Sequence, residues 1–188
     1  MKKTLAGVLL MGVSAFAAAA EPDFSNVQIT TLPLAPGLAM LIGQGGNIAV
    51  STGSDGPVIV DDQFAPLVPK ITAAVKALQD APIRFVINTH HHFDHTGGNE
   101  GFGNAGALIF AHENVRTKMA SEQVSRLMNR TMPASPEAAL PVVTFDDGVT
   151  LHWNDEIIRV EHVASAHTDG TAISGLRRPT PCTWVTPS

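Results

Sequence analysis

One stretch of the chain limits its fold more than any other. It runs from Thr89 to Asn99 and reads Thr-His-His-His-Phe-Asp-His-Thr-Gly-Gly-Asn. The short apolar run Ile83–Ile87 precedes it and has the composition of a buried strand. Because two glycines lie near its end, the stretch is predicted to be a loop at the end of that strand.

Four residues of this loop are of the types that bind metal ions, namely His90, His92, Asp94 and His95. Imidazole nitrogens and carboxylate oxygens are the groups that zinc binds where thiolates are absent. Residues two apart in an extended chain point the same way, so His90 and His92 can reach one ion. Asp94 continues on that side as the chain turns, and His95 points elsewhere and can hold a second ion nearby. His91 falls on the opposite face and is not expected to be a ligand. A run of packed surface histidines, the alternative, does not explain this spacing.

The pattern His90-x-His92-x-Asp94-His95 resembles the signature of the metallo-β-lactamase-fold hydrolases. The resemblance implies an α/β (α+β) fold, a four-layer αβ/βα sandwich with one or two metal ions along one edge of its sheets. Members of this family cleave β-lactams, thioesters, lactones and phosphoesters with a metal-bound hydroxide.

The resemblance also assigns roles to residues. A histidine followed by Thr or Ser and Gly completes the first metal site of the family, and His167 in the run 166–170 matches it. It therefore implies a Zn²⁺ site of His90, His92 and His167 with its fourth position left for water. Asp94 and His95 would begin a second zinc site, and Asp94 would be the catalytic residue that orients the nucleophile.

Four other polar residues leave more than one interpretation open. Asp61 and Asp62 follow an apolar run, and they can either begin a turn or form a hydrogen bond to a metal-binding histidine. His112 is interpreted as structural, because the resemblance gives it no ligand role. His162 is interpreted as a strand histidine whose hydrogen bonds are satisfied within the fold.

The remaining pattern predicts the elements of a sandwich. A helix is expected over 66–80, with Leu67, Ile71, Ala74, Val75 and Leu78 facing the core, and a second helical stretch from His112 to about Arg130. Strands are expected over 27–32, 38–42, 47–51, 58–60, 83–87 and 107–111, followed by an antiparallel meander over 142–145, 149–153 and 157–162.

The two ends of the chain contain features that bear on export and on disulfide formation. Residues 1–20 begin with two lysines after Met1, continue with an apolar segment and end in a run of four alanines, as in a bacterial signal peptide cleaved near Ala20/Glu21. A periplasmic or secreted protein is therefore expected. Removing them takes the net charge from −5 to −7 and leaves no stable membrane insertion. No basic patch suggests nucleic acid, and the partner is expected to be a small-molecule substrate. The single cysteine, Cys182, cannot form an internal disulfide.

Residues 21–188 are expected to form one domain whose second half is incomplete. The family pattern continues after Gly170 with further strands, a bridging carboxylate and a last histidine, and residues 176–181 show no strand-like alternation. Back-translated and read in a shifted frame, residues 179–188 give Asp-Ala-Val-His-Val-Gly-Asp-Thr-Phe, which resembles the family's Val-His-x-Gly-Asp strand. A frameshift near residues 171–178, with 174–188 out of frame, is therefore expected; an authentic short protein is the alternative.

The expected function is a zinc-dependent hydrolase that uses a metal-bound hydroxide on a carbonyl substrate: a β-lactam, a thioester or a lactone. The alternative is an inactive metal-binding remnant of such a hydrolase. A third interpretation is a periplasmic zinc-binding or redox-relay partner.

Overall fold

The structure is a computed structural model, and it describes residues 23–125, 130–164 and 166–177. The predicted signal peptide and residues 178–188 lie outside the described residues, so the cleavage site and the shifted frame stay predictions. Among the described helices, none is long and apolar enough to cross a membrane.

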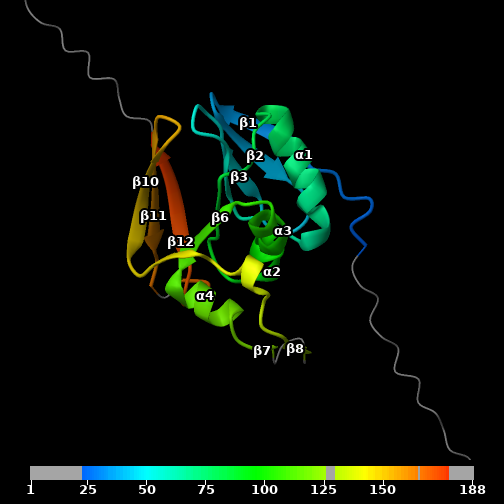
Figure 1. Ribbon diagram of the computed structural model, residues 1–188, viewed down its shortest axis with the longest axis vertical. Coiled ribbons are helices and arrows are strands. Elements are labelled where there is room, and N and C mark those ends of the chain that lie inside the picture. Colours follow the sequence, from blue (N-terminus) through cyan, green and yellow to red (C-terminus); the bar gives the residue numbers. More distant parts are fainter. Residues whose placement is uncertain (1–22, 126–129, 165, 178–188) are drawn as a thin grey trace, which may run out of the picture.

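A seven-stranded sheet forms the centre of the fold, in the order β1-β2-β3-β4-β5-β6-β9 (Figure 1). Its first four strands are antiparallel neighbours, and its last four are parallel. Its strands are β1 (Thr30–Ala35), β2 (Leu38–Ile42), β3 (Ile48–Ser51), β4 (Val58–Val60), β5 (Phe85–Ile87), β6 (Leu108–His112) and β9 (Val143–Phe145). Parallel strands end at one edge of a sheet, so the residues that follow β4 and β5 meet there.

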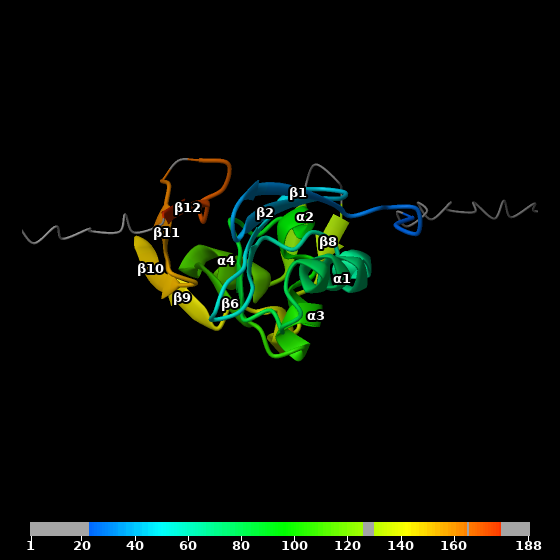
Figure 2. The same ribbon diagram turned by 90° about the horizontal axis from the view of Figure 1, so that it is seen from above.

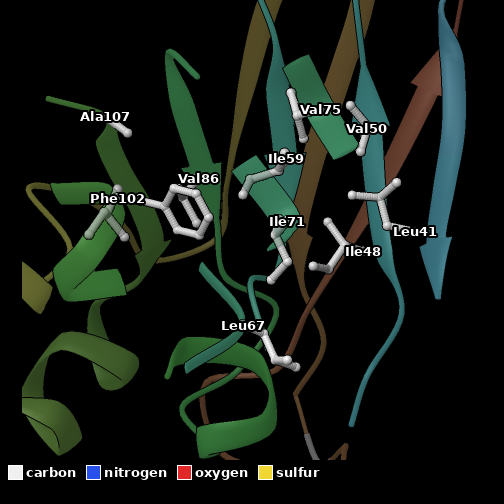
Figure 3. Close-up of a cluster of buried hydrophobic side chains, with 11 residues drawn as sticks. Leu41, Ile48, Val50, Ile59, Leu67, Ile71, Val75, Val86, Phe102 and Ala107 are labelled. Atoms are coloured by element: carbon white, nitrogen blue, oxygen red, sulfur yellow. The ribbon is translucent and has the colours of Figure 1, made fainter. Parts of the chain in front are cut away.

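Helices cover one face of this sheet. They are α1 (Val68–Leu78), preceded by the 3-10 turn η1 (Ala65–Leu67), together with α2 (Phe93–Thr96) and α3 (Asn99–Asn104). Leu67 of η1 and the apolar face of α1, through Ile71 and Val75, pack on β2, β3 and β4 and are fully buried (Figure 3). Phe102 of α3 closes the same cluster against Val86 of β5. The predicted helix and most of its core face are confirmed, but Leu78 is 38% exposed.

A three-stranded antiparallel sheet lies on the other face of the central sheet (Figures 1 and 2). It consists of β10 (Gly148–Trp153), β11 (Glu156–His162) and β12 (Ala172–Arg177). Ile158 and Val160 of β11 pack against Ile87, Phe110 and Phe145 of the central sheet in a second buried cluster. The helices, the seven-stranded sheet and the three-stranded sheet therefore form three layers of the expected αβ/βα sandwich. The described residues include no helix layer outside the three-stranded sheet. The chain has the expected mixed α and β architecture.

The expected helix from His112 to Arg130 is wrong in its length. Helix α4 (Glu113–Met119) ends after two turns, and β7 (Gln123–Ser125) follows and pairs with β8 (Arg130–Met132). The hydroxyl of Ser121 donates to the carbonyl of Thr117 at 2.9 Å, and so competes with further helical hydrogen bonds. Val124 is exposed, so no core contact supports a longer helix.

Three strand predictions also need correction. Strand 142–145 does not belong to a meander, because β9 pairs in parallel with β6 in the central sheet and buries Phe145 there. The first strand lies at 30–35 rather than 27–32, since it pairs with β2 and tolerates Pro33 as an edge strand. Residues 172–177 form β12, which extends into the part where no strand was expected, because all six positions pair with β11.

Candidate metal centre

The histidine-rich loop begins where β5 ends and is closed by a pair of buried asparagines. Asn88 and Asn99 exchange side-chain hydrogen bonds of 3.0 and 2.9 Å, so the two ends of the loop are tied together. His92 is extended, with φ −69° and ψ 148°, and the chain then enters α2. The hydroxyl of Thr96 donates to the carbonyl of His92 at 3.1 Å and stabilises this turn.

Three histidine rings converge at this edge of the sheet. The ring centroids of His90, His92 and His167 form a nearly equilateral triangle with sides of 4.8, 4.8 and 5.0 Å, and the ring planes are 78–80° apart. Each offers a nitrogen atom, and the three atoms lie within 4.8 Å of one another. His167 Nε2 is 3.1 Å from His92 Nδ1, a separation at which two imidazole nitrogens either share a proton or bind one ion. The arrangement fits the three-histidine ligand set of a zinc site with an open position.

The electrostatics around His90 and His92 favour the uncharged form that binds metal. Burial lowers the pKa of His90 to about 4, and the neighbouring His95, His92 and His167 add to this effect. Burial also lowers the pKa of His92, with a further contribution from His167. Neutral imidazole is the metal-binding form, so near pH 7 no proton has to leave His90 or His92 before an ion binds.

Asp61 is buried directly beneath the loop. It follows β4 and lies in the left-handed region with φ 63°, a conformation that is uncommon for a non-glycine residue. Its Oδ2 accepts hydrogen bonds from His95 Nδ1 at 2.7 Å and from Thr89 Oγ1 at 2.8 Å. Of the two interpretations of Asp61, the contact with a candidate metal-binding histidine is therefore the one observed.

The same carboxylate acts on His90 through Thr89. Since the Thr89 hydroxyl donates to Asp61, its oxygen accepts the proton of His90 Nδ1, which lies 3.1 Å away. His90 Nε2 is then left unprotonated and can serve as a ligand atom. A carboxylate behind a histidine commonly fixes its tautomer at metal sites in this way.

Asp94 and His95 form a separate pair beside the three histidines. His95 Nε2 is 3.4 Å from Asp94 Oδ2, and the Asp94 side chain is 41% exposed. Burial lowers the pKa of His95, but the hydrogen bond to Asp61 and the charges of Asp61 and Asp94 outweigh it and raise this pKa above 6.5. Two ligand types thus face a second position, as the spacing predicts, while the described residues supply no third group there.

Several features of the site were not predicted from sequence. Gly46, in the turn between β2 and β3, lies directly against the His95 ring, and a Cβ atom there would overlap that ring. Asp62 accepts a hydrogen bond from the Gly98 amide at 2.8 Å rather than contacting a ligand side chain. His112 has a structural contact, since its Nδ1 accepts a hydrogen bond from the backbone amide of Asn114, and His91 lies outside the three-histidine group.

Comparisons with known proteins agree with this fold. A family model described as the metallo-beta-lactamase superfamily matches residues 32–175. A metallo-beta-lactamase with an HARLDQ motif from Cronobacter sakazakii is 20% identical, with a TM-score of 0.69, and the match covers 80% of this chain and 59% of that one. A class B3 di-zinc metallo-beta-lactamase from an Alaskan soil metagenome is 21% identical, with a TM-score of 0.70, over 87% of this chain and 64% of that one.

A third solved structure is the subclass B3 enzyme BJP-1 of Bradyrhizobium japonicum, which is 20% identical, with a TM-score of 0.61, over 74% of this chain and 53% of that one. The chain thus spans between about half and two thirds of the length of these relatives. With the family model covering most of its length, the chain belongs to the metallo-beta-lactamase superfamily.

Proposed function

We propose that the protein is a zinc-dependent hydrolase of carbonyl substrates, in which His90, His92 and His167 hold the zinc ion. The observation that carries this proposal is the convergence of three imidazole nitrogens within 4.8 Å at an exposed sheet edge. A buried histidine cluster with a structural role would be closed on all sides, whereas His167 is exposed to solvent.

The residues of the site have separate roles in the proposed hydrolysis. Zinc, when bound, polarises a carbonyl group and makes water nucleophilic near neutral pH. Asp94 lies close enough for its charge to act on both His90 and His92, and its exposed carboxylate accepts a hydrogen bond from the attacking water and takes its proton. Asp61 keeps His95 Nε2 turned toward Asp94, where the two can hold a second ion.

The substrate class we favour is a β-lactam. Support comes from the solved relatives named as B3 metallo-beta-lactamases, which share this fold at about one fifth identity. Thioesters and lactones present a carbonyl group of the same kind and are the substrates to compare. We also propose export to the periplasm or the medium, which N-terminal sequencing of the processed protein tests: a new terminus near Glu21 is expected.

A single purification series tests the proposed activity. The zinc-loaded protein is assayed with a chromogenic cephalosporin, a thioester and a lactone, alongside His92→Ala and the control His152→Ala. His152 lies exposed on β10, away from the site, so its variant keeps both zinc and turnover. His92→Ala is expected to lose both.

Two results contradict the hydrolase. Zinc bound by the three histidines without turnover of any of these substrates supports the alternative, an inactive metal-binding remnant. Zinc content unchanged in His92→Ala overturns the assignment of the site itself.

A further inference from the structure

The loop that carries His167 is fastened to helix α4, which contributes no residue to the three-histidine group. The carbonyl oxygen of Asp169, two residues after His167, accepts a hydrogen bond from Asn114 Nδ2 at 2.7 Å. His162 Nε2 lies 3.2 Å from the same oxygen and donates to it as well. One backbone carbonyl of the loop is therefore held by two side chains.

Packing reinforces this attachment. A Cβ atom at Gly170 would lie 3.1 Å from Val115 Cγ2 and 3.2 Å from Asn114 Cβ, so the loop backbone rests directly on α4. Lys118 Nζ is 3.4 Å from Asp169 Oδ2, but both side chains are substantially exposed and such pairs contribute little. The hydrogen bonds to the carbonyl and the close approach at Gly170 are the specific contacts.

Asn114 itself is held on a rigid support. The backbone amide of Asn114 donates a hydrogen bond to His112 Nδ1 at 3.1 Å, so that His112 caps the helix. The His112 ring stacks on the ring of His162, with the two centroids 3.9 Å apart. Val115, the next residue, is fully buried in a cluster with Met119 and Leu140. The side-chain amide of Asn114 is thus fixed relative to the central sheet.

Within the described part of the chain, the His167 side chain is held less closely than that of Asn114. The side chain of His167 is exposed, and its ring contacts are with His90 and His92. On the far side of the loop, the Ala172 amide donates to the Thr89 carbonyl at 2.8 Å, which fixes the start of β12 but lies five residues away. Within the loop, the Thr168 amide donates to Thr171 Oγ1 at 2.8 Å, and the Asp169 carbonyl is where the described part of the loop contacts α4.

We propose that Asn114 is a positioning residue of the metal centre: its side-chain amide holds the carbonyl of Asp169 and keeps His167 beside His92. This inference rests on the proposed function, because it concerns a ligand of the same zinc ion. Loss of the amide donor frees the loop, so His167 must be ordered again each time an ion binds, and zinc affinity falls.

The sharpest variant is Asn114→Asp. It keeps the size of the side chain and places an acid in the first turn of α4, where negative charge is favourable, but it puts a carboxylate against a carbonyl oxygen. Zinc affinity, measured by chelator competition on the full chain, is expected to fall on the order of 10-fold, as for other residues that support metal ligands. Lys118→Ala, which removes only the exposed ion pair, is the matched control and stays within about 2-fold.

Cobalt spectroscopy separates positioning from a general loss of stability. At saturating Co²⁺, the absorption spectrum of Asn114→Asp is expected to move toward that of His167→Ala, whereas a variant that is merely less stable keeps the wild-type spectrum once loaded. Gly170→Ala pushes the loop from α4 without altering Asn114, and it should shift affinity and spectrum in the same direction.

The outcomes are distinguishable. Wild-type zinc affinity and cobalt spectrum in both Asn114→Asp and Gly170→Ala overturn the role of Asn114 and leave the three-histidine site intact. If the wild-type protein binds no zinc through His92, the proposed function fails, and this inference fails with it.

Discussion

The carboxylate of Asp61 accepts a hydrogen bond from Nδ1 of His95 at 2.7 Å, across 34 residues of sequence. The same oxygen is reached by Thr89, whose hydroxyl also faces His90. One buried acid therefore orients a histidine of each candidate metal position, directly in one case and through a hydroxyl group in the other.

Replacing Asp61 with asparagine tests this relationship. The Oδ2 atom that faces His95 would become an NH2 group, which cannot accept a hydrogen bond from His95. We therefore expect zinc affinity at the Asp94–His95 position to fall about 10–100-fold. The pKa of His95 should also fall, because the hydrogen bond and charge that raise it are lost. A zinc titration and an NMR pH titration of the metal-free protein measure the two effects. Asp146→Asn, on an exposed turn, is the control, and an unchanged His95 pKa in Asp61→Asn would contradict the argument.

Gly46→Ala is expected to disturb the same position from the opposite side. The added methyl group overlaps the His95 ring, which must shift and thereby changes its contacts with Asp61 and Asp94. Zinc stoichiometry at increasing metal concentration should show the weaker site lost and the tighter one retained. Gly175→Ala meets no atom within 4 Å and serves as the control. Equal loss at both sites would show that Gly46 supports the whole loop instead.

Asp62 makes stability depend on pH. Burial raises its pKa well above 3.8, the charge of Asp61 adds to this, and the Gly98 amide opposes it. The unfolded chain releases the proton near its ordinary pKa, while the folded protein keeps it to higher pH. Between these two values the folded state binds more protons, so the free energy of unfolding falls as pH rises, by about 1.4 kcal/mol per pH unit.

Asp62→Asn removes this dependence, since the amide carries no charge at any of these pH values. Urea unfolding of the metal-free protein from pH 4 upward should give a free energy of unfolding that increases, relative to wild type, as pH rises. The variant's amide has its own desolvation cost, but that cost is the same at every pH. A difference that is flat or of opposite slope would mean that Asp62 ionises readily in the folded protein.

Two apolar residues of α1 provide a test of the core. Ile71 is fully buried, and Ile71→Ala is expected to lower the free energy of unfolding by about 2–5 kcal/mol, because it leaves a cavity. Leu78→Ala on the same helix should cost about 1 kcal/mol or less, since that side chain already contacts water. Chemical denaturation measures both, and similar losses would contradict the observed end of the core.

The features that were predicted correctly depend mostly on residues close together in sequence. The features that were missed depend on contacts between segments far apart in sequence. The alternation of His90 and His92 and the strands beside them follow from the backbone period, which neighbouring residues determine. The partner of Asp61, the approach of Gly46 to His95 and the parallel pairing of β9 with β6 each join segments far apart in sequence. The length of α4 was overestimated because helical propensity continues past Met119 while burial does not.

His92 and His167 are 75 residues apart, and they belong to loops of two different sheets. An ion held between them is a reversible cross-link that closes a long stretch of chain, and it can form only once both sheets have docked. Folding and metal uptake then become one linked equilibrium, in which each tenfold excess of free zinc over its dissociation constant adds about 1.4 kcal/mol to stability. With the proposed zinc ion as that ion, the stability of the folded protein depends on the zinc level around it as well as on its own core.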